Sequence, residues 1–168
     1  AFANLEQTYR YFNKDEFAMS ERETGIAFAM IGITAAAVQG GLVRSLSGKV
    51  RDSVMLRWGI TLQVVAFSLT ASSPSVGRRL LYVAGIVLAT GNGLAQPALA
   101  SFVSKRAGET ERGAIMGTNQ SASSLGRVLG PAMGGWLYGS VLGTSSPFWA
   151  GAVGMLLALA FAWSLRDD

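Results

Sequence analysis

The stretch SLGRVLGPAMGGWLY, residues 124–138, decides the fold of this chain. It contains four glycines, one proline and one charged residue: Gly126, Gly130, Gly134, Gly135, Pro131 and Arg127. A spacing of four places Gly126, Gly130 and Gly134 along nearly one face of a helix, the small-xxx-small pattern that lets membrane helices approach closely. Pro131 removes a backbone donor and favours a kink. Such a helix is typical of a protein that moves a solute across a membrane.

The composition of the whole chain also favours a bilayer over water. Hydrophobic residues make up 50% and charged residues only 14% of the 168 residues, whereas soluble domains carry about 25% charged residues. Asp, Glu, Lys and Arg are absent from four long runs, residues 24–43, 58–77, 80–104 and 128–165. Because a span needs roughly 20 apolar residues, the sequence predicts an all-α, polytopic membrane protein.

The predicted helices form a single transmembrane domain over residues 1–168. Residues 1–13 read as the end of a truncated helix, and residues 13–16 break its apolar pattern. Ser20 and Glu23 match a capping box, Asp52 can cap the next helix, and Ser146 before Pro147 matches an N-cap. Five complete spans are therefore expected, over about residues 21–43, 53–71, 80–104, 113–140 and 147–165.

The basic residues indicate an orientation. The net charge of +4 could suggest a nucleic-acid partner, but the lysines and arginines fall in short loops between spans, where they act as topology signals. One set of loops and the tail hold Arg44, Lys49, Arg51, Arg57, Lys105, Arg106, Arg112 and Arg166; the other set holds Arg10, Lys14, Arg22, Arg78 and Arg79. The larger set, with the C-terminus, is expected in the cytoplasm.

Cysteine and histidine are both absent. Their absence excludes a disulfide framework, a thiolate metal site and an imidazole proton shuttle. An intramembrane serine protease would need a histidine and a metalloprotease would need histidine ligands, so we expect no enzyme activity, no catalytic residues and no metal.

Several motifs, in order along the chain, resemble the C-terminal half of a major facilitator superfamily transporter, most like the bacterial drug/proton antiporters that include tetracycline efflux pumps. Residues 126–135 resemble the antiporter glycine-proline motif, here at the position of the eleventh helix. Gln39 to Arg44, followed by Lys49 and Arg51, resemble the basic cytoplasmic motif, with Gly41 as its glycine. That loop departs from the pattern at Ser45 and Ser47, where arginine or lysine is often seen, and at Arg51, where glycine is usual. Gly91, Gly93 and Pro97 resemble the tenth helix, with Pro97 as a kink.

The resemblance implies a function. It implies a bacterial inner-membrane protein in which two six-helix halves alternate around a central site, so an N-terminal half would be the partner of this chain. It also implies export of a small amphipathic, drug-like molecule coupled to protons, with no cofactor besides the proton.

Candidate cavity residues come from two polar patches. Arg127 lies 15 residues after Arg112, or about 22 Å along a helix, and a charge that deep usually faces a cavity or a partner. Its polar neighbours on the same arc are Asn119, Gln120, Ser123 and Ser124, and a smaller patch on the preceding long helix is formed by Asn92 and Gln96. The alternatives are a structural ion pair or a hydrogen bond to a carbonyl freed by the kink for Arg127, and ordinary interhelical hydrogen bonds for the polar patches.

Glu6 is the proton-coupling candidate because it is the carboxylate embedded in a helical pattern, although Arg10 could simply pair with it. Trp58, Trp136, Trp149 and Trp163 fall near predicted interfaces and are expected to form an aromatic belt. Two alternatives to an exporter stay open: a half-length membrane subunit for assembly or channel formation, and a facilitator that imports a small metabolite.

Overall fold

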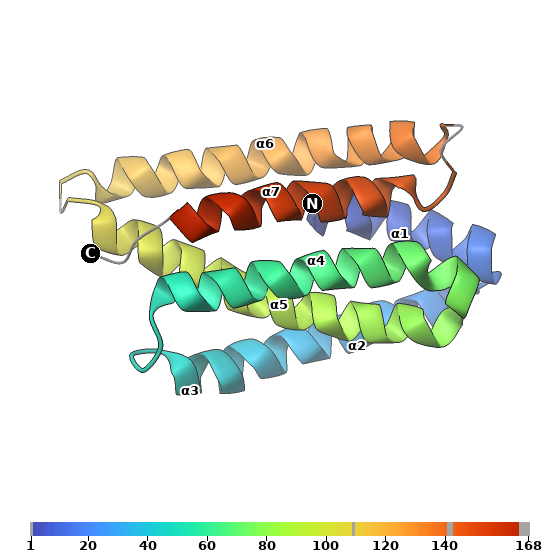
Figure 1. The fold of residues 1–168 in the computed structure, drawn as a ribbon, viewed down its shortest axis with the longest axis horizontal. Coiled ribbons are helices and arrows are strands. Elements are labelled where there is room, and N and C mark those ends of the chain that lie inside the picture. The colour runs from blue at the N-terminus through green and yellow to red at the C-terminus, as the bar shows by residue number, and fades with distance from the viewer. Residues whose placement is uncertain (1, 109, 141–142, 165–168) are drawn as a thin grey trace.

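A computed structural model describes residues 2–108, 110–140 and 143–164, with side chains from Thr8 onward (Figure 1). These residues form helices and no strand. The helices are α1 (Phe2–Phe17), α2 (Glu21–Ala37), the π-helical segment η1 (Val38–Val43), α3 (Arg44–Leu46), α4 (Asp52–Val76), α5 (Arg78–Arg106), α6 (Arg112–Tyr138) and α7 (Ser146–Ser164). Segment η1 continues α2 directly into α3, so these three elements form one rod of 26 residues.

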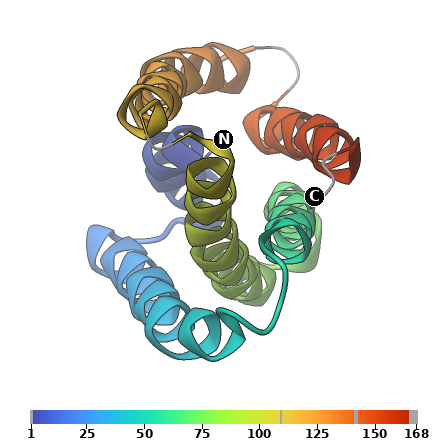
Figure 2. The ribbon, with the colours of Figure 1, turned by 90° about the vertical axis from the view of Figure 1, so that its left-hand side faces the viewer.

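The helices run side by side, and α5 lies at the centre of the bundle (Figure 2). Helix α4 packs most extensively on α5 and also on α7, whereas α2 packs on the other side of α5. Helix α6 packs mainly on α1. Aromatic side chains join α1 to the rest of the bundle, because the Phe12 ring lies 4.6 Å from that of Phe148, centroid to centroid, and Phe148 belongs to the same buried cluster as Phe67.

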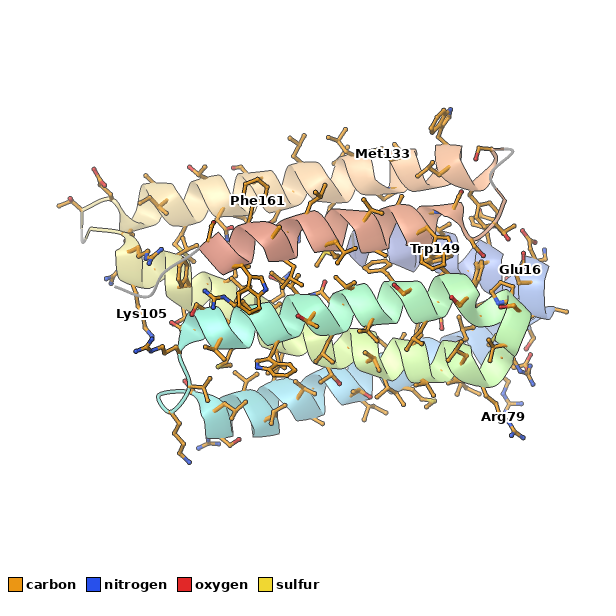
Figure 3. The ribbon with its side chains drawn as sticks, in the orientation of Figure 1. Glu16, Arg79, Lys105, Met133, Trp149 and Phe161 are labelled. Carbon is orange, nitrogen blue, oxygen red and sulfur yellow. The ribbon has the colours of Figure 1, made fainter. Side chains whose placement is uncertain are left out.

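The two ends of the bundle differ in charge, as the loop assignment from the sequence requires. The loop 47–51 and the end of α5 lie at one end, and the turns at 18–20 and 77 and the start of α7 lie at the other (Figure 1). Lys105 is at the first end, whereas Glu16 and Arg79 are at the second (Figure 3). We call the first the basic end and the second the mixed-charge end.

Helix α1 runs past residue 13 to Phe17, so the expected break at residues 13–16 is wrong. The helix ends because Ala18 adopts a left-handed conformation with φ of 48°. The Met19 N–H then donates to the Asn13 carbonyl at 3.1 Å and the Ala18 N–H donates to Lys14 at 3.1 Å. The second of these bonds is the five-to-one bond of an αL motif, in which the left-handed residue after the helix donates to the carbonyl four residues earlier. The capping box of Ser20 and Glu23 is present at the start of α2, as predicted.

Helix α4 also extends beyond its predicted end at residue 71 and passes through Pro74 to Val76. Proline cannot donate to the carbonyl four residues earlier, which here belongs to Thr70. The Ser73 hydroxyl donates to that carbonyl at 2.7 Å instead. The predicted turn at residues 72–79 therefore contracts to Gly77, whose φ of 121° suits glycine alone.

Two predicted N-caps are wrong. Asp52 is the first residue of α4, preceded by Arg51 at the cap position, and its carboxylate binds side chains of α5 instead. Ser146 is the first residue of α7, and its hydroxyl donates to the Leu137 carbonyl at 2.8 Å. In both cases a neighbouring helix supplies a partner that the local sequence does not reveal.

Helices α4 and α5 cross backbone to backbone. A Cβ atom added at Gly59 would lie 2.7 Å from the Ala95 nitrogen, and one added at Gly91 would lie 2.7 Å from the Gly59 oxygen. Only glycine fits such a crossing, which is the small-residue packing of membrane helices. The sequence singled out Gly91 but not Gly59.

Among the described helices, four are long and apolar enough to cross a membrane: the rod Glu21–Leu46, α4, α5 and α7. Helix α6 has 27 residues, about 40 Å, and is therefore long enough to cross a membrane. Its mean hydropathy is lower than that of the other four helices because its first half is rich in Ser, Thr, Asn, Gln and Gly. By hydropathy the described helices therefore account for four of the five expected spans, and α6 stays a predicted span.

Candidate functional site

Helix α6 carries the candidate site and is the most exposed long helix of the bundle. Gly134 is its one buried residue among those described. Asn119 is half-buried, whereas Gln120, Ser123, Ser124 and Arg127 are all exposed. The predicted polar arc thus lies on one continuous, uncovered surface of this helix.

Arg127 lies in the interior of α6, 15 residues after its start and 11 before its end. Its Nη2 donates to the Ser124 hydroxyl at 3.3 Å, one turn earlier on the same helix. No described carboxylate forms an ion pair with it, so the structural ion pair considered from the sequence does not occur within the described residues. The guanidinium remains on the open surface of the bundle.

Apolar side chains extend this open surface along the same helix. Leu125, Val128, Leu129 and Met133 are exposed, and Trp136 is 76% exposed; Met133 points away from the bundle (Figure 3). A surface that combines these side chains with an arginine fits neither water nor lipid alone. It is suited to contact with further protein and with a water-filled cavity.

The glycine stripe of α6 is covered only in part. Gly134 is buried and Gly130 half-buried, whereas Gly126 and Gly135 are exposed. A methyl group at Gly126 would meet no other atom within 4 Å. The helix continues through Pro131, which lines a cavity of about 270 Å³ against α1 together with Thr8, Tyr11, Gly135 and Tyr138.

The second polar patch lies on α5. Asn92 is half-buried and Gln96 is exposed. Between them, Gly93 faces η1 so closely that a Cβ atom there would lie 2.8 Å from Val38 Cγ1. Helix α5 continues through Pro97. Helix α6 packs mainly on α1, whereas α5 packs mainly on α4 and α2. The main packing contacts of α5 and α6 are therefore with other helices and not with each other.

One polar residue near the α5 patch was missed from the sequence. Gln63 on α4 is buried, and its backbone nitrogen lies at the crossing, 3.0 Å from where a Cβ of Gly91 would be. Gln63 lies one turn after Gly59, but this spacing could indicate a role at the crossing only if the crossing were already known.

The side chain of Glu6 lies outside the described part of the chain, and so its proton-coupling role stays a prediction. Arg10, considered as its partner, pairs with Glu21 at the start of α2. Two further contacts link neighbouring helix ends. Arg78 forms an ion pair with Glu23 at 2.8 Å, and the Tyr138 hydroxyl donates a hydrogen bond to Asp15 at 2.5 Å. Glu16 accepts from the Thr144 hydroxyl. These contacts hold the mixed-charge end together.

At the basic end, the motif around Gly41 lies in the rod of η1 and α3 and the following loop. Gly41, Arg44, Lys49 and Arg51 are all exposed. Gly48, which the sequence did not single out, has a φ of 79° and forms the turn of this loop. The Ser-Gly dipeptide at residues 47 and 48, which is typical of turns, is the signal that could have identified it.

Asp52 connects the start of α4 to the end of α5. Its Oδ2 accepts from the Ser101 hydroxyl and from Lys105 Nζ, both at 2.7 Å. Both contacts link α4 to α5 at the basic end. Within the described residues no group of His, Cys, Asp and Glu could hold a metal ion.

The geometry defines an all-α, polytopic integral membrane protein. A family model described as Major Facilitator Superfamily matches residues 8–168, and the chain belongs to that superfamily, whose members are transporters. No solved structure gave a significant match.

The chain is also similar to curated relatives. It is 29% identical to mouse major facilitator superfamily domain-containing protein 10, over 98% of this chain and 35% of the relative. It is 30% identical to multidrug resistance protein 2 of Bacillus subtilis, over 97% of this chain and 40% of the relative. It is 26% identical to the class G tetracycline resistance protein of Vibrio anguillarum, over 88% of this chain and 37% of the relative. The chain thus spans between a third and two-fifths of the length of these relatives.

Proposed function

We propose that this chain is the C-terminal half of a secondary active transporter that exports a small amphipathic molecule in exchange for protons. The observation that carries the proposal is the open surface of α6, where Arg127 and its polar neighbours lie uncovered inside a long membrane helix. Facing lipid, such a charge would cost several kcal/mol, roughly 2.5–3.5 on insertion scales. Facing a wet cavity between two halves, it is accommodated.

The exposed faces of α2 and α6 are the surfaces on which the N-terminal half would pack. Helix α2 exposes Ile26 and Ile33, and α6 exposes Gly126 with its apolar neighbours. Glycine at position 126 leaves room for a helix of the other half to approach closely. Substrate sites of such transporters lie near the bilayer midplane between the two halves, which is the depth of Arg127.

Roles follow for the remaining candidates. Arg127 would bind an anionic group of the substrate or pair with a coupling carboxylate, which is either Glu6 or a residue of the N-terminal half. Asn119, Gln120, Ser123, Ser124, Asn92 and Gln96 would bind polar groups of the substrate. The names of the tetracycline and multidrug resistance relatives support drug-like cargo. A bacterial inner membrane with the basic end in the cytoplasm is the matching location.

The test is the effect of Arg127→Ala on transport by the full-length protein. We expect transport of a fluorescent amphipathic dye to fall to background while the amount of protein in the membrane is unchanged, because the side chain that is removed is exposed and its described hydrogen bond is to Ser124 on the same helix rather than to another helix. Arg79→Ala is the matched control, since Arg79 is also exposed but lies at the mixed-charge end; it should transport normally.

The same assay separates the alternatives. Dye accumulation in inverted vesicles that requires an imposed proton gradient supports proton-coupled export. Accumulation in right-side-out vesicles instead would indicate an importer, and normal transport by Arg127→Ala would remove this arginine from the site.

A further inference from the structure

A cavity between α1 and α6 begins one turn beyond Arg127 along α6. It has a volume of about 270 Å³ and is lined by Thr8, Tyr11, Pro131, Gly135 and Tyr138, so none of its described lining residues is charged. Pockets that enclose a whole drug-sized ligand measure roughly 300–1,000 Å³. This cavity therefore has room for one apolar part of a small molecule rather than for the whole molecule.

Two tyrosine rings and a glycine shape the cavity. The Tyr138 hydroxyl donates to Asp15 of α1 at 2.5 Å, which fixes this ring between the two helices. Tyr11, on the α1 side, is 63% exposed. A methyl group at Gly135 would meet no other atom within 4 Å, so the α6 wall is open at this position. Because aromatic rings pack favourably on one another, these walls suit a planar aromatic group better than a flexible alkyl chain.

Arg127 and the cavity share one face of α6. Pro131 follows Arg127 by four residues and Tyr138 follows it by eleven, so both lie within about 40° of it around the helix. Arg127 Nη2 donates to the Ser124 hydroxyl, one turn earlier. The guanidinium therefore lies about 10 Å along the helix from Pro131. A single elongated ligand can contact the guanidinium with one end and the cavity with the other.

The charges around this face favour an anionic ligand. Among the described residues, the hydrogen-bond partner of Arg127 is a neutral hydroxyl, and the ion pairs involve other residues. The carboxylate of Asp15, beside the cavity, accepts from Tyr138. A planar guanidinium binds a carboxylate through two parallel hydrogen bonds, whereas it repels a cationic amphiphile.

We propose that α1 and α6 together bind an aromatic carboxylate, with its carboxylate at Arg127 and its ring in the cavity beside Tyr11 and Tyr138. This inference rests on the proposed function and narrows its cargo from any small amphipathic molecule to an aromatic organic anion. Arg127 selects the charge of the ligand, and the two tyrosines select its shape.

The test is equilibrium binding to the full-length transporter, purified in a neutral detergent, with naphthylpentanoate as the probe. Decanoate lacks the ring, and naphthylpentanol lacks the charge. Naphthylpentanoate should bind about fivefold more tightly than decanoate, because its ring packs on the tyrosines. It should bind about tenfold more tightly than the alcohol, because its hydrogen bonds to Arg127 are between charged groups. Arg127→Ala should abolish the preference for the acid over the alcohol, and Tyr11→Leu should abolish the preference for the ring.

Gly135→Leu tests the cavity itself. The leucine side chain would occupy the space of the ring, so naphthylpentanoate should bind roughly tenfold more weakly once its ring is no longer buried. Gly154→Leu on α7 is the matched control, since Gly154 is also exposed and a methyl group there would meet no atom within 4 Å. This variant should bind naphthylpentanoate like the wild type.

Three results would each overturn the proposal: equal binding of naphthylpentanoate and decanoate by the wild type, a preference for the acid that survives in Arg127→Ala, or undiminished binding by Gly135→Leu. The measurement needs no proton gradient and is therefore separate from the transport assay. Binding as predicted without proton-dependent dye transport would support this site and contradict proton-coupled export. Dye transport by a protein that does not distinguish naphthylpentanoate from decanoate would leave export standing and overturn this site.

Discussion

Ala18 is the one described residue other than glycine with a positive φ. A left-handed conformation costs an L-residue with a Cβ roughly 1–2 kcal/mol, yet it is required here because the chain must reverse between α1 and the capping box of α2. The hydrogen bonds from Ala18 to Lys14 and from Met19 to Asn13 offset part of this cost.

Ala18→Gly should therefore stabilise the protein by about 1 kcal/mol, since glycine adopts this conformation without steric strain. Thermal unfolding of the purified transporter measures the change. The control is Ala29→Gly, at an exposed position inside α2, which should lower stability by roughly 0.5–1 kcal/mol. Destabilisation by Ala18→Gly would show that the turn is not strained.

At the scale of helices, the crossing of α4 and α5 depends on two glycines that face one another. Gly59→Ala should destabilise the protein by roughly 1–3 kcal/mol, because the added carbon would lie 2.7 Å from a backbone nitrogen that cannot move alone. Gly117→Ala on α6 is the matched control, since its methyl group would meet no atom within 4 Å. Equal unfolding temperatures for both variants would contradict the close crossing.

The sequence predicts these helices well where local signals determine them. The uncharged runs located the helices, and the pair of Ser20 and Glu23 located the start of α2. Prediction was wrong where another helix supplies the partner, as for Asp52, which binds Ser101 and Lys105 instead of capping α4. The span expected to end at about residue 71 continues through Pro74, because the compensating bond from Ser73 depends on a rotamer that the sequence does not reveal.

The candidate site was predictable in composition but not in arrangement. The spacing of Gln120, Ser124 and Arg127 placed them on one arc of a helix, and all three are exposed there. That Gly126 is uncovered while Gly134 is buried could not be predicted, because it depends on where α1 lies against α6. Gly59 was missed for the same reason, since its partner Gly91 lies on another helix.

At the scale of the molecule, the bundle has two unlike sides. The large side chains that α7 exposes are all apolar, whereas α6 exposes an arginine, serines and a glutamine beside its apolar residues. One side is suited to lipid and the other to a partner half and a wet cavity. This asymmetry is the central claim about the architecture.

Labelling of single cysteines with a membrane-impermeant, water-soluble thiol reagent tests that claim most directly. The chain has no cysteine of its own. Labelling of a cysteine introduced into it is therefore measured as the increase over the labelling of the unmodified full-length transporter. We predict that Ser123→Cys on α6 reacts readily, and that bound substrate slows the reaction, whereas Leu157→Cys on α7 does not react. Reaction at Leu157→Cys with none at Ser123→Cys would contradict the account, because α6 would then face lipid and α7 the cavity.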